Sequence, residues 1–256
     1  DPMSENQNPY SAPEAEVAQE TLSDFALHEP RMVGVGRGIA WIGEGFSYFS
    51  RSAGGWILTC IVGFLIMIAL NFIPIINIFA GLLSYVWLGG LVYGCKAQSD
   101  GQAFEVNYLF EGFSQKFGQL LLLGVLIFFT GVAIFVLAFI DLLMVLLSDD
   151  MSSLADDSMM LGLRLLIVFA LLLPLYMAAW FAPCLIMLND VSVFKSLKLS
   201  FIGCLKNFVA FIPYGVILLF LFILGTLPLL LGLLVVMPMF FASIFISYKE
   251  IFIDEA

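Results

Sequence analysis

The sequence predicts an all-α polytopic membrane protein, with six transmembrane helices arranged as three repeats of an interfacial amphipathic helix followed by a two-helix hairpin. Three observations predict this fold: the apolar composition, six long apolar segments, and a short phrase that occurs twice. Of the 256 residues, 62% are hydrophobic and 12% are charged, and the mean hydropathy is +1.05. Soluble domains carry about 25% charged residues, so a chain this apolar needs lipid as part of its solvent.

Six apolar segments are long enough to cross a bilayer, which takes about 20 mostly apolar residues in a helix. They cover residues 56–73, 75–93, 117–147, 160–188, 208–227 and 228–248. Each run is continuous, whereas the strands of a membrane barrel alternate polar and apolar residues. The third and fourth segments are longer than a bilayer requires, so we expect their outer ends to tilt or to project into water.

The basic residues predict how the chain is oriented in the membrane. Apart from Arg164, every lysine and arginine lies on one side of the predicted spans, and the other side carries the loop SDDMSSLADDS, which has no basic residue. Cytoplasmic loops of membrane proteins carry the excess of lysine and arginine. Both termini are therefore predicted to be cytoplasmic, which in a bacterial cell means a protein of the inner membrane.

The tetrapeptide Glu-Gly-Phe-Ser begins at Glu44 and again at Glu111, each time just before a long apolar segment. Apolar residues in steps of three and four precede the first, third and fifth spans, which predicts amphipathic helices lying in the cytoplasmic interface. The chain thus divides into an acidic, weakly folding cytoplasmic tail and three units. These parts cover residues 1–36, 37–103, 104–190 and 191–256. The alternative is that any helix leading into a span would look similar.

Two groups of motifs resemble known families. The segments NPYSAPEAEV at 8–17 and GRGIAWIGEGFSYF at 36–49, followed by a hairpin with a proline at its turn, resemble an uncharacterised family of bacterial six-helix inner-membrane proteins. The segment WFAPCLIMLNDVSVFKSLKLSF at 180–201 is similar to a phrase of the wider glycerophosphodiesterase membrane-domain group. The resemblance covers most of the chain and implies the architecture, but it implies no catalytic residues.

The leading functional hypothesis is a non-enzymatic protein that acts through its lipid-facing and interfacial surfaces, as an accessory, scaffold or lipid-interacting component of the envelope. Near an anionic membrane surface each basic residue contributes on the order of 1 kcal/mol to association. The residues predicted to contact lipid headgroups are Arg37, Arg51, Lys195, Lys198 and Lys206. The expected partners are anionic membrane lipids, with a homo-oligomer or a partner membrane protein as further possibilities. Nucleic acid is not expected, because the chain has no basic tract.

The alternative function is a transporter or pore for a small apolar or amphipathic molecule. Helices broken near the middle of a membrane can mark a transport site, and prolines interrupt the later spans, at Pro174, Pro183, Pro213 and Pro238. Proline is also simply common in membrane helices. An enzyme is not expected, since the only histidine is His28 in the tail and the spans hold no set of catalytic residues. No cofactor or metal site is predicted.

Few other residues in the spans invite a function. Asp141 and Arg164 are predicted to form an ion pair near the outer surface, with a gated proton or anion site as the functional alternative. Gly90 and Gly94 form a GxxxG motif, which we expect to pack helices closely within the protein or between protomers. The cysteines lack the CxxC spacing of metal sites and are expected to be reduced packing residues: Cys60, Cys95, Cys184 and Cys204.

Overall fold

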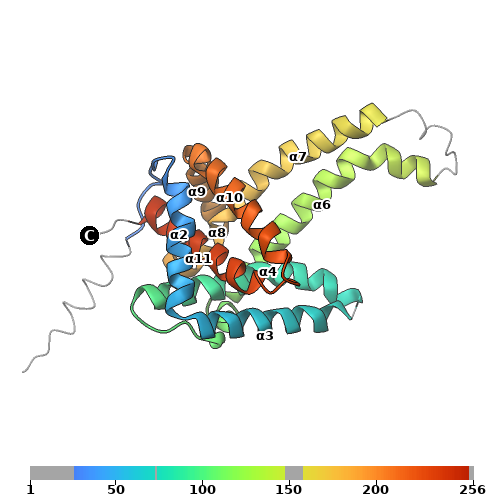
Figure 1. The fold of residues 1–256 in the computed structure, drawn as a ribbon. Helices are drawn as coiled ribbons and strands as arrows, with labels where there is room; N and C mark the ends of the chain where they lie inside the picture. Colours follow the sequence, from blue (N-terminus) through green and yellow to red (C-terminus); the bar gives the residue numbers. More distant parts are fainter. Residues whose placement is uncertain (1–25, 73, 148–157, 254–256) are drawn as a thin grey trace, which may run out of the picture.

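A computed structural model describes the protein over residues 26–72, 74–147 and 158–253, and the side chains of these residues except 71, 74–80, 141–147 and 158–160. Within these ranges the regular secondary structure is helical (Figure 1). The β-contact found there is an isolated antiparallel bridge between Leu27 and Ile253. The predicted all-α fold is confirmed.

Each of the six predicted apolar segments is mostly helical over its described residues. The helices are α3 (Ala53–Asn71), α4 (Pro74–Ser99), α6 (Phe117–Leu147), α7 (Ser158–Trp180) with α8 (Ala182–Asn189), α10 (Phe208–Thr226) and α11 (Leu233–Phe252). Five stretches of the described chain have the length and composition of membrane spans, in α3, α6, α7–α8, α10 and α11. Helix α4 begins among residues whose side chains are not described. The acidic loop predicted between the third and fourth spans lies at 148–157, outside the described residues.

Three details differ from the predicted spans. The last span begins at Leu233 rather than at residue 228, because the chain turns between α10 and α11, where Leu229 and Leu230 have φ angles of 52° and 68°. Helix α6 bends at Phe139, whose backbone leaves the helical conformation (φ −122°, ψ 16°). The fourth span is broken before α8, where Pro183 lies in the first turn of a new helix and its missing N–H donor is not needed.

Short helices precede the first, third and fifth spans, as the periodicity predicts. They are α2 (Arg37–Arg51), the 3₁₀ helix η1 (Val106–Phe110) with α5 (Glu111–Gln115), and α9 (Val193–Lys206). Each packs against the second helix of a neighbouring hairpin: η1 and α5 on α4, α9 on α7, and α2 on α11. The last pairing joins the first of these short helices to the last helix of the described chain, so the three packing contacts form a closed ring.

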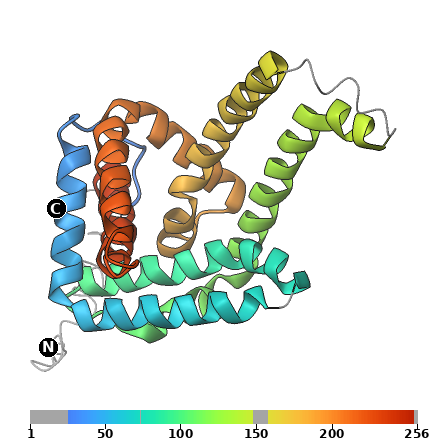
Figure 2. The same cartoon turned by 45° about the vertical axis from the view of Figure 1, so that its right-hand side comes forward.

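The buried core lies around α2, α8 and α11 rather than along the full length of the spans. In α11, 61% of the residues of the span are buried within the protein, against 11–22% in the other four candidate spans. The hairpins α3–α4 and α6–α7 diverge from this centre, and the ends of α6 and α7 that lie farthest from it extend beyond the other helices (Figures 1 and 2). Large apolar side chains are exposed on the spans, for example Phe64 on α3, Phe129 on α6, Phe169 on α7 and Phe220 on α10. Such a surface requires contact with lipid tails.

Residues 26–36 of the predicted weakly folding tail are docked on the protein. Backbone N–H groups of His28 and Arg31 donate to carbonyl oxygens at the end of α11, at 2.9 and 3.0 Å. Asn207, which is 2% exposed, accepts from the backbone N–H of Val33 at 2.8 Å and donates to the carbonyl oxygen of Arg31 at 2.9 Å. This stretch is therefore held between α11 and the junction of α9 with α10.

The repeated phrase Glu-Gly-Phe-Ser marks the closest approach of two short helices to their partner helices. A Cβ atom on Gly45 would lie 2.5 Å from the carbonyl oxygen of Met239 in α11. A Cβ atom on Gly112 would lie 2.0 Å from the carbonyl oxygen of Val86 in α4. Both helices therefore need glycine at this point, because only a residue without a side chain lets the two backbones approach so closely.

The third short helix uses a hydroxyl group at its contact instead of a glycine. Ser200 of α9 is fully buried, and its Oγ donates to the carbonyl oxygen of Met177 in α7 at 2.7 Å. The Oγ atom of Ser200 also accepts a hydrogen bond from the backbone N–H of Phe181 at 2.9 Å. Ser200 thereby satisfies backbone groups that the break between α7 and α8 would otherwise leave without a partner.

Candidate functional site

A polar cluster joins the start of α2 to the end of α11. The carboxylate of Glu250 accepts from Arg37 Nε at 2.7 Å and from the indole Nε1 of Trp41 at 2.5 Å. Arg37 also pairs with Glu44, through Nη2 at 2.8 Å, and Arg31 Nε donates to the backbone carbonyl of Glu250 at 2.5 Å. The hydrogen bond to Glu250 raises the pKa of Arg37 above its usual value, against the opposing effect of burial. The charged groups of this cluster pair with one another, and their hydrogen bonds join α2 to α11.

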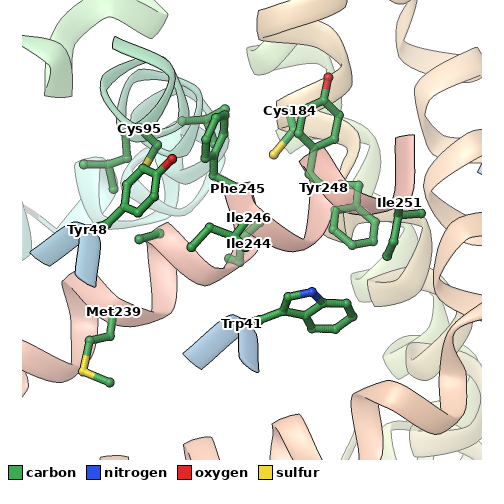
Figure 3. Close-up of a cluster of buried hydrophobic side chains, with 14 of the residues drawn as sticks. Trp41, Tyr48, Cys95, Cys184, Met239, Ile244, Phe245, Ile246, Tyr248 and Ile251 are labelled. Carbon is green, nitrogen blue, oxygen red and sulfur yellow. The ribbon is translucent and has the colours of Figure 1, made fainter. Parts of the chain in front are cut away.

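The residues of the segment GRGIAW make the contacts of α2 with the neighbouring helices. Gly38 brings α2 against α10, since a Cβ atom there would lie 2.0 Å from the carbonyl oxygen of Ala210. Trp41 is fully buried beside α11 (Figure 3). Its ring packs against the rings of Phe211 and Tyr214. The motif marked Arg37 and Trp41 in the sequence, but nothing in the sequence around Glu250 indicated that both residues bind it.

Two of the five predicted headgroup contacts bond to other parts of the described chain. Arg37 lies between Glu250 and Glu44. Lys206 donates through Nζ to the backbone carbonyl of Pro30 at 2.9 Å and so helps to hold the docked N-terminal stretch. Helix periodicity places a basic residue on a surface, but it does not tell whether another part of the same chain covers that surface.

The other three predicted headgroup contacts are exposed, as Lys206 also is, but among the described residues they form no hydrogen bond or ion pair with another segment. Lys195 and Lys198 project from α9, and neither forms an ion pair with another described residue. Arg51 ends α2, with its guanidinium 4.8 Å from the centre of the Tyr48 ring and Nη2 at 3.3 Å from the hydroxyl of Ser47. These contacts orient Arg51 and leave its charge without a carboxylate among the described residues.

A second ion pair links two connecting segments on the same side of the chain. Lys116, between α5 and α6, donates through Nζ to the carboxylate of Asp190 at 2.5 Å. Asp190 follows α8 in a left-handed conformation with φ of 54°. The hydrogen bond from Lys116 lowers the pKa of this exposed carboxyl group.

The predicted outer ion pair stays a prediction. The side chain of Asp141 lies outside those described, and Arg164 is half-buried on α7. The four cysteines are free thiols, three of them buried and Cys60 half-buried. Among the described residues, no three histidine, cysteine, aspartate or glutamate side chains come together as a metal site.

Gly90 and Gly94 pack closely against the segment that follows α4, not against another span. A Cβ atom on Gly90 would lie 2.4 Å from the carbonyl oxygen of Tyr108, in η1. A Cβ atom on Gly94 would lie 2.5 Å from the ring of Phe104. The GxxxG motif thus provides the groove in which the second short helix sits.

Gly90→Ala should destabilise the protein by about 1–3 kcal/mol, the usual cost of overpacking a filled site. The contacted atom belongs to the backbone and has no rotamer by which to move away. Gly81→Ala is the matched control on the same helix, because a Cβ atom there meets nothing within 4 Å. Apparent melting temperatures in mild detergent compare the two; equal values would contradict this account of the motif.

Two apolar crevices lie between neighbouring hairpins. The α3 crevice, of about 640 Å³, lies between α3 and the α10–α11 hairpin, and its lining includes Trp56, Phe64, Trp87, Leu230, Met237 and Phe241. The α6 crevice, of about 530 Å³, lies between α4 and the α6–α7 hairpin, and its lining includes Tyr85, Gly124, Phe128, Val132, Leu175 and Tyr176. Neither lining contains a charged residue. The sequence did not predict these crevices.

Comparison with known proteins gives one similarity. No protein-family model matches the chain, and no solved structure matches it. A protein of Burkholderia thailandensis named as a probable inner membrane protein is 26% identical over 193 residues, which cover 70% of this chain and 71% of that protein. Together with the five candidate spans, this similarity identifies a helical membrane protein with a relative named as a probable inner membrane protein.

Proposed function

We propose that this protein is a non-enzymatic component of the bacterial inner membrane that binds anionic lipid headgroups through α2 and α9. The observation that carries the proposal is the exposure of Arg51, Lys195 and Lys198 on helices that lead directly into apolar spans. Basic residues at this position meet the negative surface of the cytoplasmic leaflet. Headgroup phosphates accept charge-assisted hydrogen bonds from both lysine and arginine.

The proposed arrangement in the membrane has six spans, with α4 as the sixth, and cytoplasmic termini. Three repeats of a short helix and a hairpin account for the ring of contacts that α2, α5 and α9 make with α11, α4 and α7. The carbonyl groups touched by Gly45 and Gly112 belong to Met239 and Val86, and each lies ten residues before a lysine near the end of its helix. This correspondence supports an internal repeat.

The resemblance of residues 180–201 to the glycerophosphodiesterase membrane-domain group supports the proposed architecture and no activity. The segment forms α8 and the first half of α9, with Asp190 paired to Lys116 between them. Its buried serine, Ser200, joins α9 to α7. These residues perform packing and ion pairing, so the resemblance adds no activity.

Neutralising the three exposed basic residues together (Arg51→Gln, Lys195→Gln, Lys198→Gln) should weaken binding of phosphatidylglycerol about 100-fold, at about 1 kcal/mol for each charge. Native mass spectrometry of the protein released from gentle detergent measures the retained lipid. The melting temperature should change little, because these side chains are exposed. Undiminished retention of phosphatidylglycerol by the triple variant would contradict the proposal.

The paired change Arg37→Gln and Lys206→Gln is the control for charge. It removes two basic residues whose side chains bond to Glu250 and to the backbone of Pro30 in the same chain. We expect it to lower thermal stability while the preference for phosphatidylglycerol over phosphatidylcholine remains. If this double variant loses the preference and the triple variant keeps it, the proposal has named the wrong residues as the lipid-binding ones.

Transport of a small apolar or amphipathic molecule is the second candidate function. The α3 and α6 crevices favour it, because apolar spaces between hairpins offer a path from the lipid phase. A fluorescent phospholipid analogue in liposomes tests it directly. Faster exchange of the analogue between leaflets with the protein than without it would favour transport over simple lipid association.

A further inference from the structure

We propose that the α3 crevice holds one acyl chain of an anionic phospholipid whose phosphate group contacts Arg51. This inference rests on the proposed function, since it names the site and the class of lipid. The charged and the apolar parts of such a site adjoin in the chain: Arg51 ends α2 and α3 begins at Ala53.

The crevice has the dimensions of a lipid chain in one leaflet. Its lining on α3 runs from Trp56 to Met67, eleven residues along the helix, or about 16 Å. This is close to half the hydrocarbon thickness of about 30 Å. The volume of about 640 Å³ is bounded on the opposite side by α11 and by Leu109 of η1.

The chemistry of the lining fits a hydrocarbon chain and not water. The hydroxyl of Thr59 already donates to the carbonyl oxygen of Gly55 at 2.8 Å. The rest of the lining is mostly aliphatic and aromatic, with no charged residue. Water in such a space would lack the two to four polar partners that hold buried water in proteins, whereas methylene groups find contacts along the whole wall.

The rim of the crevice is built at a conformational cost. Leu229 and Leu230, which line it opposite α3, adopt left-handed backbone conformations that leucine rarely takes. Leu229 is 89% exposed and Leu230 is 54% exposed. The turn thus exposes two leucine side chains at the edge of the apolar crevice, and a lipid chain bound in the crevice would cover them. Strained residues of this kind often lie where a ligand is clamped.

Arg51 supplies the complementary charge at the end of α3 where the crevice begins. Its guanidinium is oriented by the Tyr48 ring and by Ser47, with Nη2 the atom bonded to the hydroxyl. A guanidinium has five N–H donors in a planar fork that matches a phosphate group. In the proposed site the acyl chain runs along α3 from this phosphate, since Trp56, the first α3 residue of the lining, lies five residues after Arg51 in the chain.

Gly63→Phe tests the site by filling it. Gly63 lines the crevice, and a Cβ atom there has Leu109 Cδ2 at 4.0 Å as its nearest neighbour, so a side chain enters without striking the backbone. Gly54→Phe is the matched control on the same helix, in open space outside the lining. Native mass spectrometry of the full chain with phosphatidylglycerol should find one tightly retained lipid in the wild type and in Gly54→Phe. Retention should fall at least tenfold in Gly63→Phe.

The outcomes separate this inference from the proposed function. If the wild type prefers phosphatidylglycerol to phosphatidylcholine and Gly63→Phe retains it equally well, the crevice is not the site and only the present inference fails. If the wild type shows no preference, the proposed function fails as well. A wild-type dimer that Gly63→Phe dissociates would mean that a second copy of the chain fills the crevice, which also overturns the inference.

A second measurement keeps the test decisive should Gly63→Phe not fold. Phosphatidylglycerol with brominated acyl chains, added at one lipid per chain in detergent, should quench the fluorescence of wild-type protein. Trp87 lines the crevice, so Trp87→Phe should remove a large part of that quenching. Quenching that is absent, or that is unchanged in Trp87→Phe, overturns the inference.

Discussion

Replacing Gly112 with alanine should be one of the two most destabilising single-methyl changes in the short helices that precede the spans, the other being Gly38→Ala, whose Cβ atom would also lie 2.0 Å from a carbonyl oxygen. The new Cβ atom would lie 2.0 Å from the carbonyl oxygen of Val86 and 2.9 Å from its carbonyl carbon. Backbone atoms in the middle of a helix cannot turn aside, so α5 would have to move off α4. We expect a loss of at least about 3 kcal/mol, at or beyond the upper end for overpacked sites.

Gly45→Ala should act in the same way on the contact of α2 with α11, but less strongly, because its nearest atom is 2.5 Å away. The matched controls are Gly43→Ala on α2 and Gly118→Ala on α6, where a Cβ atom meets nothing within 4 Å. These controls should be neutral or slightly stabilising, since alanine is the better helix former. Fluorescence-detected size exclusion after heating ranks the four variants. A Gly112→Ala protein as stable as Gly118→Ala would refute the close packing of α5 on α4.

Glu250→Ala should cost about 2–3 kcal/mol of stability. It removes the acceptor of the Trp41 indole N–H, and a buried donor left without a partner costs about 1–3 kcal/mol. The lost ion pair adds little, because the side chain of Arg37 is 39% exposed and solvent screens its charge. The expected consequence is a loosening of α2 from α11, which opens the ring of packing contacts.

Glu250→Gln separates the two contributions. Glutamine keeps an oxygen acceptor for Trp41 but removes the charge that faces Arg37, so we expect a loss below about 1 kcal/mol. Arg37→Gln should be similarly mild. Thermal unfolding of the three variants in the same detergent gives the order. If Glu250→Gln is as damaging as Glu250→Ala, the ion pair and not the indole hydrogen bond holds the helices together.

The EGFS and GRGIAW segments show how much of a packing contact can be predicted from a short motif. The two glycines of the repeated phrase were visible as a repeat, but their partners, Met239 and Val86, lie far along the chain or in the preceding hairpin. The same is true of Arg37, which the sequence assigned to lipid and which binds a carboxylate 213 residues away. Local periodicity identifies which residues share a helix face and is silent about what that face meets.

The apolar segments and the short helices were determined by the sequence itself. In lipid, backbone N–H and C=O groups must bond to one another. A sufficiently long apolar segment therefore forms a helix, which pairs these groups within the segment itself. Periodic apolar residues likewise predicted α2, α5 and α9. Most helix ends lie within about four residues of the predicted span ends. The exceptions are the end of α4, at Ser99 rather than residue 93, and the start of α11, at Leu233 rather than residue 228, because the turn after α10 occupies residues that hydropathy assigned to the span.

Only the tertiary structure decided how these helices combine. It placed α2 on α11 and bonded Arg37 and Lys206 to other parts of the chain. It left Arg51, Lys195 and Lys198 exposed and without an ion pair among the described residues, and opened crevices where the hairpins diverge. The physical reason is that a helix in lipid can form without its neighbours, because its hydrogen bonds are local. Pairing of helices, by contrast, depends on close fits such as that of Gly112 against Val86, between atoms brought together only by the complete fold.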